Sequence, residues 1–234
     1  MKASLISHPI RSFVLRNGKM TRAQARAYTE LKDRYCIPFD PAQPLDFSRL
    51  FSGFAQIVLE IGFGMGEATA KLAETRKETG FLGIEVHTAG VGKLLWEIEQ
   101  RKLENIRIIE EDAVLVLNCM ISPNSLDGVH IFFPDPWPKK RHHKRRLLTP
   151  DFLDLVASRM KDGAYLYLVT DWEEYAHWML HAAKECPSLE NPYPGFSLRQ
   201  PWRPETVFER KGIQAGRSIY EMYLIKSSAG EHTE

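Results

Sequence analysis

Carboxylates beside a glycine-rich loop are the first residues of this 234-residue chain whose types and spacing could do chemistry. Glu60 precedes Gly62, Gly64 and Gly66 in the run LEIGFGMGE, and Glu67 ends that run. Glycines before a helix let the backbone approach a ligand closely, but flanking carboxylates would repel a pyrophosphate. Glu67 also occupies the place of the third glycine in a dinucleotide-binding fingerprint. The loop therefore indicates a cationic ligand without phosphates, such as a sulfonium, unless the glycines serve packing alone.

Two further acids follow the next two apolar runs. Glu85 lies 19 residues past Gly66, where an acid can accept hydrogen bonds from both hydroxyls of a ribose. Asp112 and Ala113 follow the third run, where a carboxylate could reach an adenine edge. Either acid could instead cap the helix that comes after it. Acids at successive strand ends around one glycine loop are typical of methyltransferases that bind S-adenosylmethionine.

A proline-rich turn carries the most specific pattern, FFPDPWPKKRHHKRR. Prolines on both sides of Asp135 restrict the backbone and hold that carboxylate in place. Trp137 offers a flat surface on which a base could stack, or it could belong to the core. Residues 139–146 follow with six Lys or Arg, two His and no acid, so they could bind phosphates beside a reaction centre. A solvated basic loop is the alternative.

The charge is distributed unevenly along the chain. Summed over the whole chain, the formal net charge of +1 argues against a protein that binds nucleic acid, but this sum hides an asymmetry. Residues 1–34 contain eight Lys or Arg against two acids, and residues 139–146 are purely basic. The remainder has 17 basic against 28 acidic residues, a net of −11. The protein is therefore predicted to be an acidic body that carries two basic segments.

The elements that must hold these residues alternate between strand and helix patterns. Short apolar runs predict strands at 57–61, 81–86, 106–109, 128–133, 164–169 and 218–225. Helices are predicted at 21–34, at 67–78 with Gly80 as its stop, around 91–98 and 114–120, from Thr149 onwards, and over 172–179. This order indicates a doubly wound, mostly parallel α/β sheet, whose ligands bind at the carboxyl ends of the strands.

Cysteine usage and hydropathy place the chain among cytoplasmic proteins. Cys36, Cys119 and Cys186 are widely spaced and no Cys/His cluster has zinc spacing, so no metal is expected. The N-terminus has no signal-peptide core and no apolar stretch is long enough to span a membrane, so no membrane partner is expected. The sequence leaves open whether the protein is a monomer or a homodimer.

Five segments together resemble one family, the bacterial tRNA (guanine-N7-)-methyltransferases. They are LEIGFGMGEA, GIEVH, FFPDPWPKKRHHKRRL, TDWEEYA and TVFERKG, spread over residues 58–212. The resemblance implies the class I (Rossmann-like) methyltransferase fold, S-adenosyl-L-methionine as cofactor, and guanine 46 in the variable loop of tRNA as target. It also implies a basic, partly flexible N-terminal extension at 1–50 and a methyltransferase domain at 51–226. The polar tail at 227–234 is predicted from its sequence to be disordered.

The resemblance further implies site residues. The catalytic carboxylate would be Asp135. Cofactor contacts would fall on Glu60, Gly62, Gly64, Gly66, Glu85, Asp112, Ala113 and Asp135. Substrate contacts would fall on Lys139, Asp171, Thr206, Val207, Phe208 and Glu209. RNA contacts would fall on Arg141, His142, His143, Lys144, Arg145 and Arg146.

Guanine N7 carries a free lone pair, so its methylation needs no general base and can rest on positioning and electrostatics. Asp135, Asp171 or Glu209 could accept hydrogen bonds from the guanine edge, and the sequence does not decide among them. Asp171 could instead begin a helix, with Glu174 completing a capping box, and residues 206–209 alone predict a polar loop. The alternatives are a methyltransferase of another nucleic acid or of an exocyclic base nitrogen, and an RNA-binding module with a vestigial cofactor fold.

Overall fold

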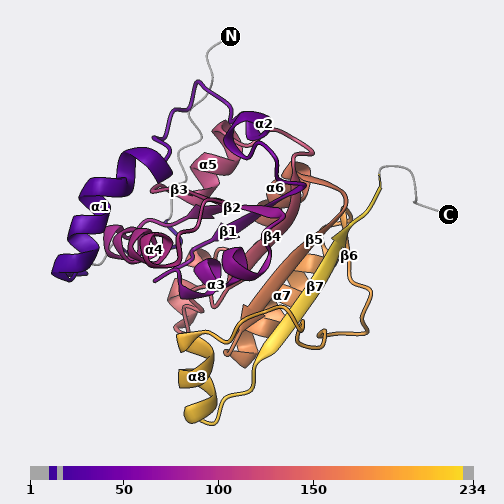
Figure 1. Ribbon diagram of the computed structural model, residues 1–234. Coiled ribbons are helices and arrows are strands. Elements are labelled where there is room, and N and C mark those ends of the chain that lie inside the picture. Colours follow the sequence, from indigo (N-terminus) through magenta and orange to yellow (C-terminus); the bar gives the residue numbers. More distant parts are fainter. Residues whose placement is uncertain (1–10, 15–17, 229–234) are drawn as a thin grey trace.

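A seven-stranded sheet forms the centre of the computed structural model, which describes residues 11–14 and 18–228 (Figure 1). The strand order is β3-β2-β1-β4-β5-β7-β6. The strands are β1 Gln56–Ile61, β2 Thr79–Ile84, β3 Ile106–Ile109, β4 Leu126–Phe132, β5 Met160–Thr170, β6 Leu189–Glu190 and β7 Tyr220–Lys226. β7 runs antiparallel to both of its neighbours, and the other pairs are parallel. The predicted doubly wound, mostly parallel sheet is confirmed.

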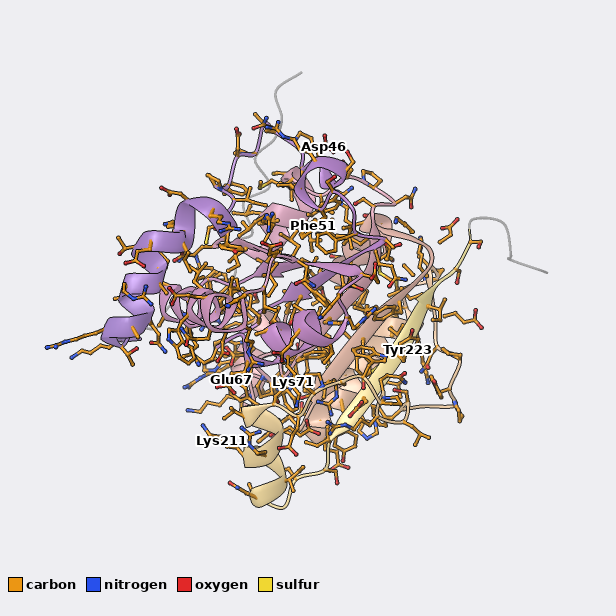
Figure 2. All side chains as sticks on the ribbon, viewed as in Figure 1. Asp46, Phe51, Glu67, Lys71, Lys211 and Tyr223 are labelled. Carbon is orange, nitrogen blue, oxygen red and sulfur yellow. The ribbon has the colours of Figure 1, made fainter. Side chains whose placement is uncertain are left out.

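Helices cover both faces of this sheet. They are α1 Arg22–Tyr35, α2 Phe47–Leu50, α3 Glu67–Thr75, α4 Thr88–Arg101, α5 Ala113–Cys119, the 3₁₀ helix η1 Lys140–Arg145, α6 Pro150–Arg159, α7 Glu173–Lys184 and α8 Val207–Gln214. Buried side chains of α1, α3 and α4 form one apolar core, and those of α5, α6 and α7 form another. Side chains fill the space between the helices and the sheet (Figure 2). Each fully buried Leu or Ile contributes about 1.5–3 kcal/mol through removal from water.

The predicted helix starts at Thr21 and Thr149 are confirmed. The Gln24 amide donates to the Thr21 hydroxyl over 3.3 Å, and the Gln24 side chain accepts from the Thr21 amide over 2.9 Å. Thr149 accepts from the Phe152 amide over 3.3 Å, and Pro150 takes the first helical position. Side-chain acceptors satisfy amides that the first turn leaves without partners, which sets where each helix begins.

The prediction that Gly80 stops a helix is wrong. α3 ends at Thr75, and Gly80 lies inside the buried strand β2. A Cβ atom at Gly80 would lie 2.4 Å from the ring of Phe51, which packs there from the end of α2 (Figure 2). Gly80 is therefore required because the Phe51 ring packs closely against β2 at this position, and not because a helix ends there.

The described part of the basic N-terminal extension packs on the domain. Ala27 of α1 is fully buried, and Arg26 donates to Glu99 of α4 over 2.9 Å. Tyr35 donates to the carbonyl of Leu103 over 3.1 Å. The flexibility predicted for the first residues and the disorder predicted for the tail fall mainly on residues 1–10, 15–17 and 229–234, which lie outside the described residues. Among the described helices, none is long and apolar enough to span a membrane.

Candidate active site

The glycine loop after β1 has a backbone that only glycine adopts without strain. Gly62, Gly64 and Gly66 have φ values of 72°, 59° and 72°, in the left-handed region. A Cβ atom at Gly66 would lie 2.7 Å from Cβ of Leu94, so α4 packs directly against the loop. The sequence run therefore produces a loop without side chains at these three positions, immediately before the N-terminus of α3.

Two carboxylates lie against this loop. Glu60 in β1 is 2% exposed and accepts a hydrogen bond of 2.8 Å from the Thr69 hydroxyl. Burial raises the pKa of Glu60 to about 7, and the nearby charge of Glu85 adds to the effect. Glu85 accepts from the Gly64 amide over 2.8 Å and from the amides of residues 86 and 87. Glu85 therefore fixes the shape of the loop, and the helix-cap alternative for it is wrong because His87 is the N-cap of α4.

The third strand-end acid, Asp112, caps a helix as the alternative predicted. Its Oδ1 accepts from the Val114 amide over 2.9 Å at the start of α5, and Ala113 is the first residue of that helix. Asp112 is 9% exposed. The cap uses one carboxylate oxygen, and Oδ2 has no hydrogen-bond partner among the described residues. A second oxygen at the carboxyl end of β3 thus stays available for a ligand donor.

The turn after β4 has an unusual backbone. Phe133 and Trp137 have φ values of 53° and 48°, in a region that aromatic residues rarely adopt. The Phe133 amide donates to the carbonyl of Val169 over 2.8 Å, which ties the turn to β5. Asp135 lies between these two aromatic residues and is exposed. The Phe133–Val169 bond and these two backbone conformations place Asp135 at the carboxyl end of β4.

Residues 206–209 form the first turn of α8, so the prediction of a polar loop is wrong. Thr206 and Glu209 form a capping box, with the Glu209 amide donating to the Thr206 hydroxyl over 3.1 Å. Val207 begins the helix, and Phe208 is 58% exposed. The Phe208 ring stacks on Phe133 with centroids 6.3 Å apart. α8 lies at the end of the sheet where β5 ends (Figure 1).

Glu209 is held in a buried ion network. Arg203 donates to both of its carboxylate oxygens, over 2.7 and 2.8 Å, and Arg199 pairs with it as well. Arg203 also donates to Glu221 of β7 over 2.7 Å. Glu209 and Arg203 are each 2% exposed. Burial raises the pKa of Glu209, but the bonds and charges of the two arginines outweigh it and hold that pKa below its ordinary value.

Asp171, after β5, is also paired. Its Oδ2 accepts from Nε of Arg217 over 2.8 Å, and a Cβ atom at Gly212 of α8 would lie 2.8 Å from the same oxygen. The predicted capping box of Asp171 with Glu174 is wrong, because Trp172 is the N-cap of α7 and no side chain caps that helix. Of the three acids that the sequence could not rank, Asp171 and Glu209 are paired with arginines. Asp135 is exposed and forms no ion pair with another described residue.

The basic run forms η1, and its side chains do not all face solvent. Arg141 and Lys144 are exposed, as is Lys139, which is the N-cap of η1. The Arg145 guanidinium lies 4.2 Å from the centre of the Trp137 ring, so one face of that indole is covered. Arg146 departs from the expected RNA contact, because its side chain has no exposed area.

Backbone carbonyls of the N-terminal extension lie on this turn. Trp137 donates from Nε1 to the carbonyl of Ser12 over 3.0 Å. Arg145 donates to the carbonyls of Arg11 and Phe13 over 3.1 and 3.3 Å. The two basic segments that the charge distribution singled out are therefore in direct contact beside Asp135.

A hollow of about 520 Å³ lies elsewhere, at the amino-terminal ends of β1 and β5. Arg76, Lys161, Tyr165 and Trp202 line it together with Gln56. It is at the opposite end of the strands from the glycine loop and the acids. Among the described residues, no cluster of three His, Cys, Asp or Glu could hold a metal ion.

Fold and site together define a class I methyltransferase that uses S-adenosyl-L-methionine. The strand order with one reversed strand belongs to this fold class, and the bare glycine loop with strand-end acids suits a cationic nucleoside donor. The fold alone is similar to that of the 16S rRNA methyltransferase KamB, with a TM-score of 0.57 and 14% identity over 78% of this chain and 93% of KamB.

Sequence comparisons define the particular family. Residues 55–222 match the family described as "Putative methyltransferase". The chain is 52% identical to the tRNA (guanine-N(7)-)-methyltransferase of Paraburkholderia xenovorans, over 94% of this chain and 85% of that protein. It is 51% identical to the protein of the same name from Methylobacillus flagellatus, over 94% and 93%. The chain belongs to the tRNA (guanine-N7-)-methyltransferase family, which confirms the resemblance.

Proposed function

We propose that the protein transfers the methyl group of S-adenosyl-L-methionine to N7 of guanine 46 in the variable loop of tRNA, forming 7-methylguanosine. Membership of the family supports the tRNA substrate and the guanine-N7 product. The observation in the structure that carries the mechanism is the exposed carboxylate of Asp135, which forms no ion pair with another described residue and lies at the sheet edge that also holds the glycine loop. Because the substrate is tRNA, we expect the protein to act in the cytoplasm.

The residues after β1, β2 and β3 would hold the donor, which supplies an activated methyl group on a sulfonium. Three loop residues, Gly62, Gly64 and Gly66, carry no side chain, so the donor could approach the backbone closely. Glu85 would accept from the ribose hydroxyls while it keeps its bonds to the loop amides, and Asp112 with Ala113 would contact the base. Glu60 is a buried acid beneath the loop, and its ionised carboxylate would attract the cationic donor.

Asp135 is the group that we assign to the target guanine. Methylation at N7 leaves positive charge on the purine, and a carboxylate beside it stabilises that developing charge. No proton has to leave N7, so the contribution of Asp135 is orientation and electrostatic stabilisation. Phe208 and Phe133 form an apolar wall next to the glycine loop, against which a base could pack. Asp171 and Glu209, being paired with arginines, hold α8 in place for this wall.

The exposed side of η1 would bind the tRNA backbone. Lys139, Arg141 and Lys144 are exposed beside Asp135, so phosphate contacts there would hold the tRNA close to the reaction centre. The domain that carries this chemistry spans residues 51–226, and the basic N-terminal extension of residues 1–50 adds a second positive segment.

Mass analysis of nucleosides tests this function. The purified protein is incubated with labelled donor and, in separate reactions, with tRNA, rRNA and duplex DNA. We expect 7-methylguanosine from tRNA alone, and reductive cleavage at the modified nucleotide should give one product that ends at the variable loop. Label in an N6 or C5 product, or in rRNA or DNA only, would refute the assignment. Failure to bind the donor in calorimetry would instead favour an RNA-binding module.

A further inference from the structure

The 3₁₀ helix η1 has three sides with different surroundings. Three residues make one turn of a 3₁₀ helix, so residues three apart lie on the same side. One side is exposed, the second packs on Trp137, and the third packs on α7. These sides carry, in that order, Arg141 with Lys144, His142 with Arg145, and His143 with Arg146, which is the C-cap of η1. The side chains of this basic run are alike in sequence, but in the structure they have three different surroundings.

Arg146 is enclosed by protein, although its Nη1 has no hydrogen-bond partner among the described residues. Its Nε donates to the carbonyl of Pro136 over 3.0 Å, and its Nη2 donates to Glu174 over 3.0 Å. The guanidinium lies 5.1 Å from the centre of the Tyr175 ring and 5.0 Å from that of Trp178. The side chain has no exposed area. A phosphate could reach this guanidinium only after the protein contacts were broken.

These contacts join the turn that carries Asp135 to α7. Pro136 follows Asp135 directly, and its carbonyl is the group that Arg146 holds. The turn lies between Phe133 and Trp137, two residues with strained left-handed backbones, and such strain persists only where the surroundings enforce it. Because the rings of Tyr175 and Trp178 hold the guanidinium in place, Arg146 fixes the position of the turn relative to α7.

We propose that Arg146 is a positioning residue for methyl transfer, which holds the Asp135 turn against α7 and does not bind tRNA. The proposal rests on the proposed function, because it assumes that Asp135 acts on the guanine. It separates Arg146 from Arg141 and Lys144 in the same run, which are exposed and which the proposed function assigns to phosphate. The rate of the chemical step therefore depends on Arg146, and the affinity for tRNA depends on the exposed side of η1.

Matched variants of the full chain test this division: Arg146→Met, Arg146→Lys and, as the exposed control, Lys144→Met. Three quantities are measured for each: the single-turnover rate at saturating tRNA and donor, the Kd for tRNA from about 50 to about 200 mM salt, and the Kd for the donor. Arg146→Met should lower the rate about 10- to 100-fold, since small misplacement of a catalytic group has that effect. Its salt dependence should match wild type. Arg146→Lys should restore part of the rate, because one ammonium keeps the charge but not the fork of donors.

Lys144→Met should behave in the opposite way. Its Kd for tRNA should rise, and the slope of log K against log salt should become shallower by about 0.7–0.9 for the lost phosphate contact. If Arg146→Met shows this pattern, Arg146 contacts phosphate and the proposal is wrong. If Arg146→Met does not fold, Glu174→Gln decides, because Glu174 is half-exposed and the change is mild. A lowered rate with an unchanged salt slope supports the proposal, and a normal rate overturns it.

Failure of the proposed function and failure of the positioning role give different results in this assay. Wild-type protein in the same reactions must produce 7-methylguanosine in tRNA. Absence of that product would refute the proposed function itself. Normal product from wild type together with a normal single-turnover rate for Arg146→Met would refute the positioning role alone.

Discussion

Arg203→Met should destabilise the protein by about 3–5 kcal/mol, the usual result of removing one partner from a buried ion pair. Arg203 has no exposed side-chain area and donates to both oxygens of Glu209 and to Glu221. Methionine fills similar volume, so the loss arises from uncompensated charge. Glu221 limits that loss, because burial raises its pKa to about 7 and it can take up a proton near neutral pH. Glu209 keeps only Arg199, so most of the free-energy change comes from Glu209.

The effect of Arg203→Met should depend on pH with a defined sign. In the wild type the arginines hold the pKa of Glu209 below its ordinary value, so Glu209 contributes stability above about pH 4.5 that is lost as the pH falls. In the variant that contribution is already missing. The difference in free energy of unfolding between wild type and variant should therefore be large at pH 8 and shrink as the pH falls below about 4.5.

Urea unfolding followed by tryptophan fluorescence measures these free energies, with linear extrapolation at each pH. Arg210→Met is the control on the same helix, because its pair with Glu205 is exposed and 3.2 Å long. Such a pair contributes about 0–1 kcal/mol. A loss for Arg203→Met no larger than for the control, or a loss that stays the same from pH 8 to well below pH 4.5, would show that the buried network does not stabilise α8.

Three other changes have defined outcomes. Asp135→Ala should lower turnover about 100-fold or more with an unchanged melting temperature, and near-normal rates would remove Asp135 from the mechanism. Wild-type affinity for the cationic donor should rise as the pH passes through about 7, where Glu60 becomes charged, and calorimetry should find this dependence absent in Glu60→Gln. Gly66→Ala should weaken both folding and donor binding, since φ is 72° and the new Cβ would lie 2.7 Å from Leu94; a thermal melt equal to wild type would contradict this.

Features that depend on local sequence were predictable. The capping box at Thr21, the N-cap at Thr149, the glycine loop and the acids at strand ends all follow from short-range patterns. The same kind of signal was present in Thr206-Val207-Phe208-Glu209, a capping box that marks the start of α8. The surrounding prolines and the shortness of the helix favoured a loop instead.

Features that depend on distant partners were not predictable from the sequence alone. Arg217 pairs with Asp171 across 46 positions, and no local pattern links the two. The buried location of Arg146 depends on a 3₁₀ helix, whose period of three puts that arginine on the side of α7. In sequence, Arg146 is indistinguishable from the other arginines of the run, Arg141 and Arg145.

The docking of residues 11–13 on the Trp137 turn has a consequence for sequence variation. Trp137 and Arg145 contact the carbonyl groups of Arg11, Ser12 and Phe13, which every amino acid carries. Substitutions at these three positions therefore preserve the acceptors, whereas changes at Trp137 or Arg145 remove the donors. The sequence of the N-terminal segment can therefore diverge during evolution while the segment packs at the same position beside the reaction centre.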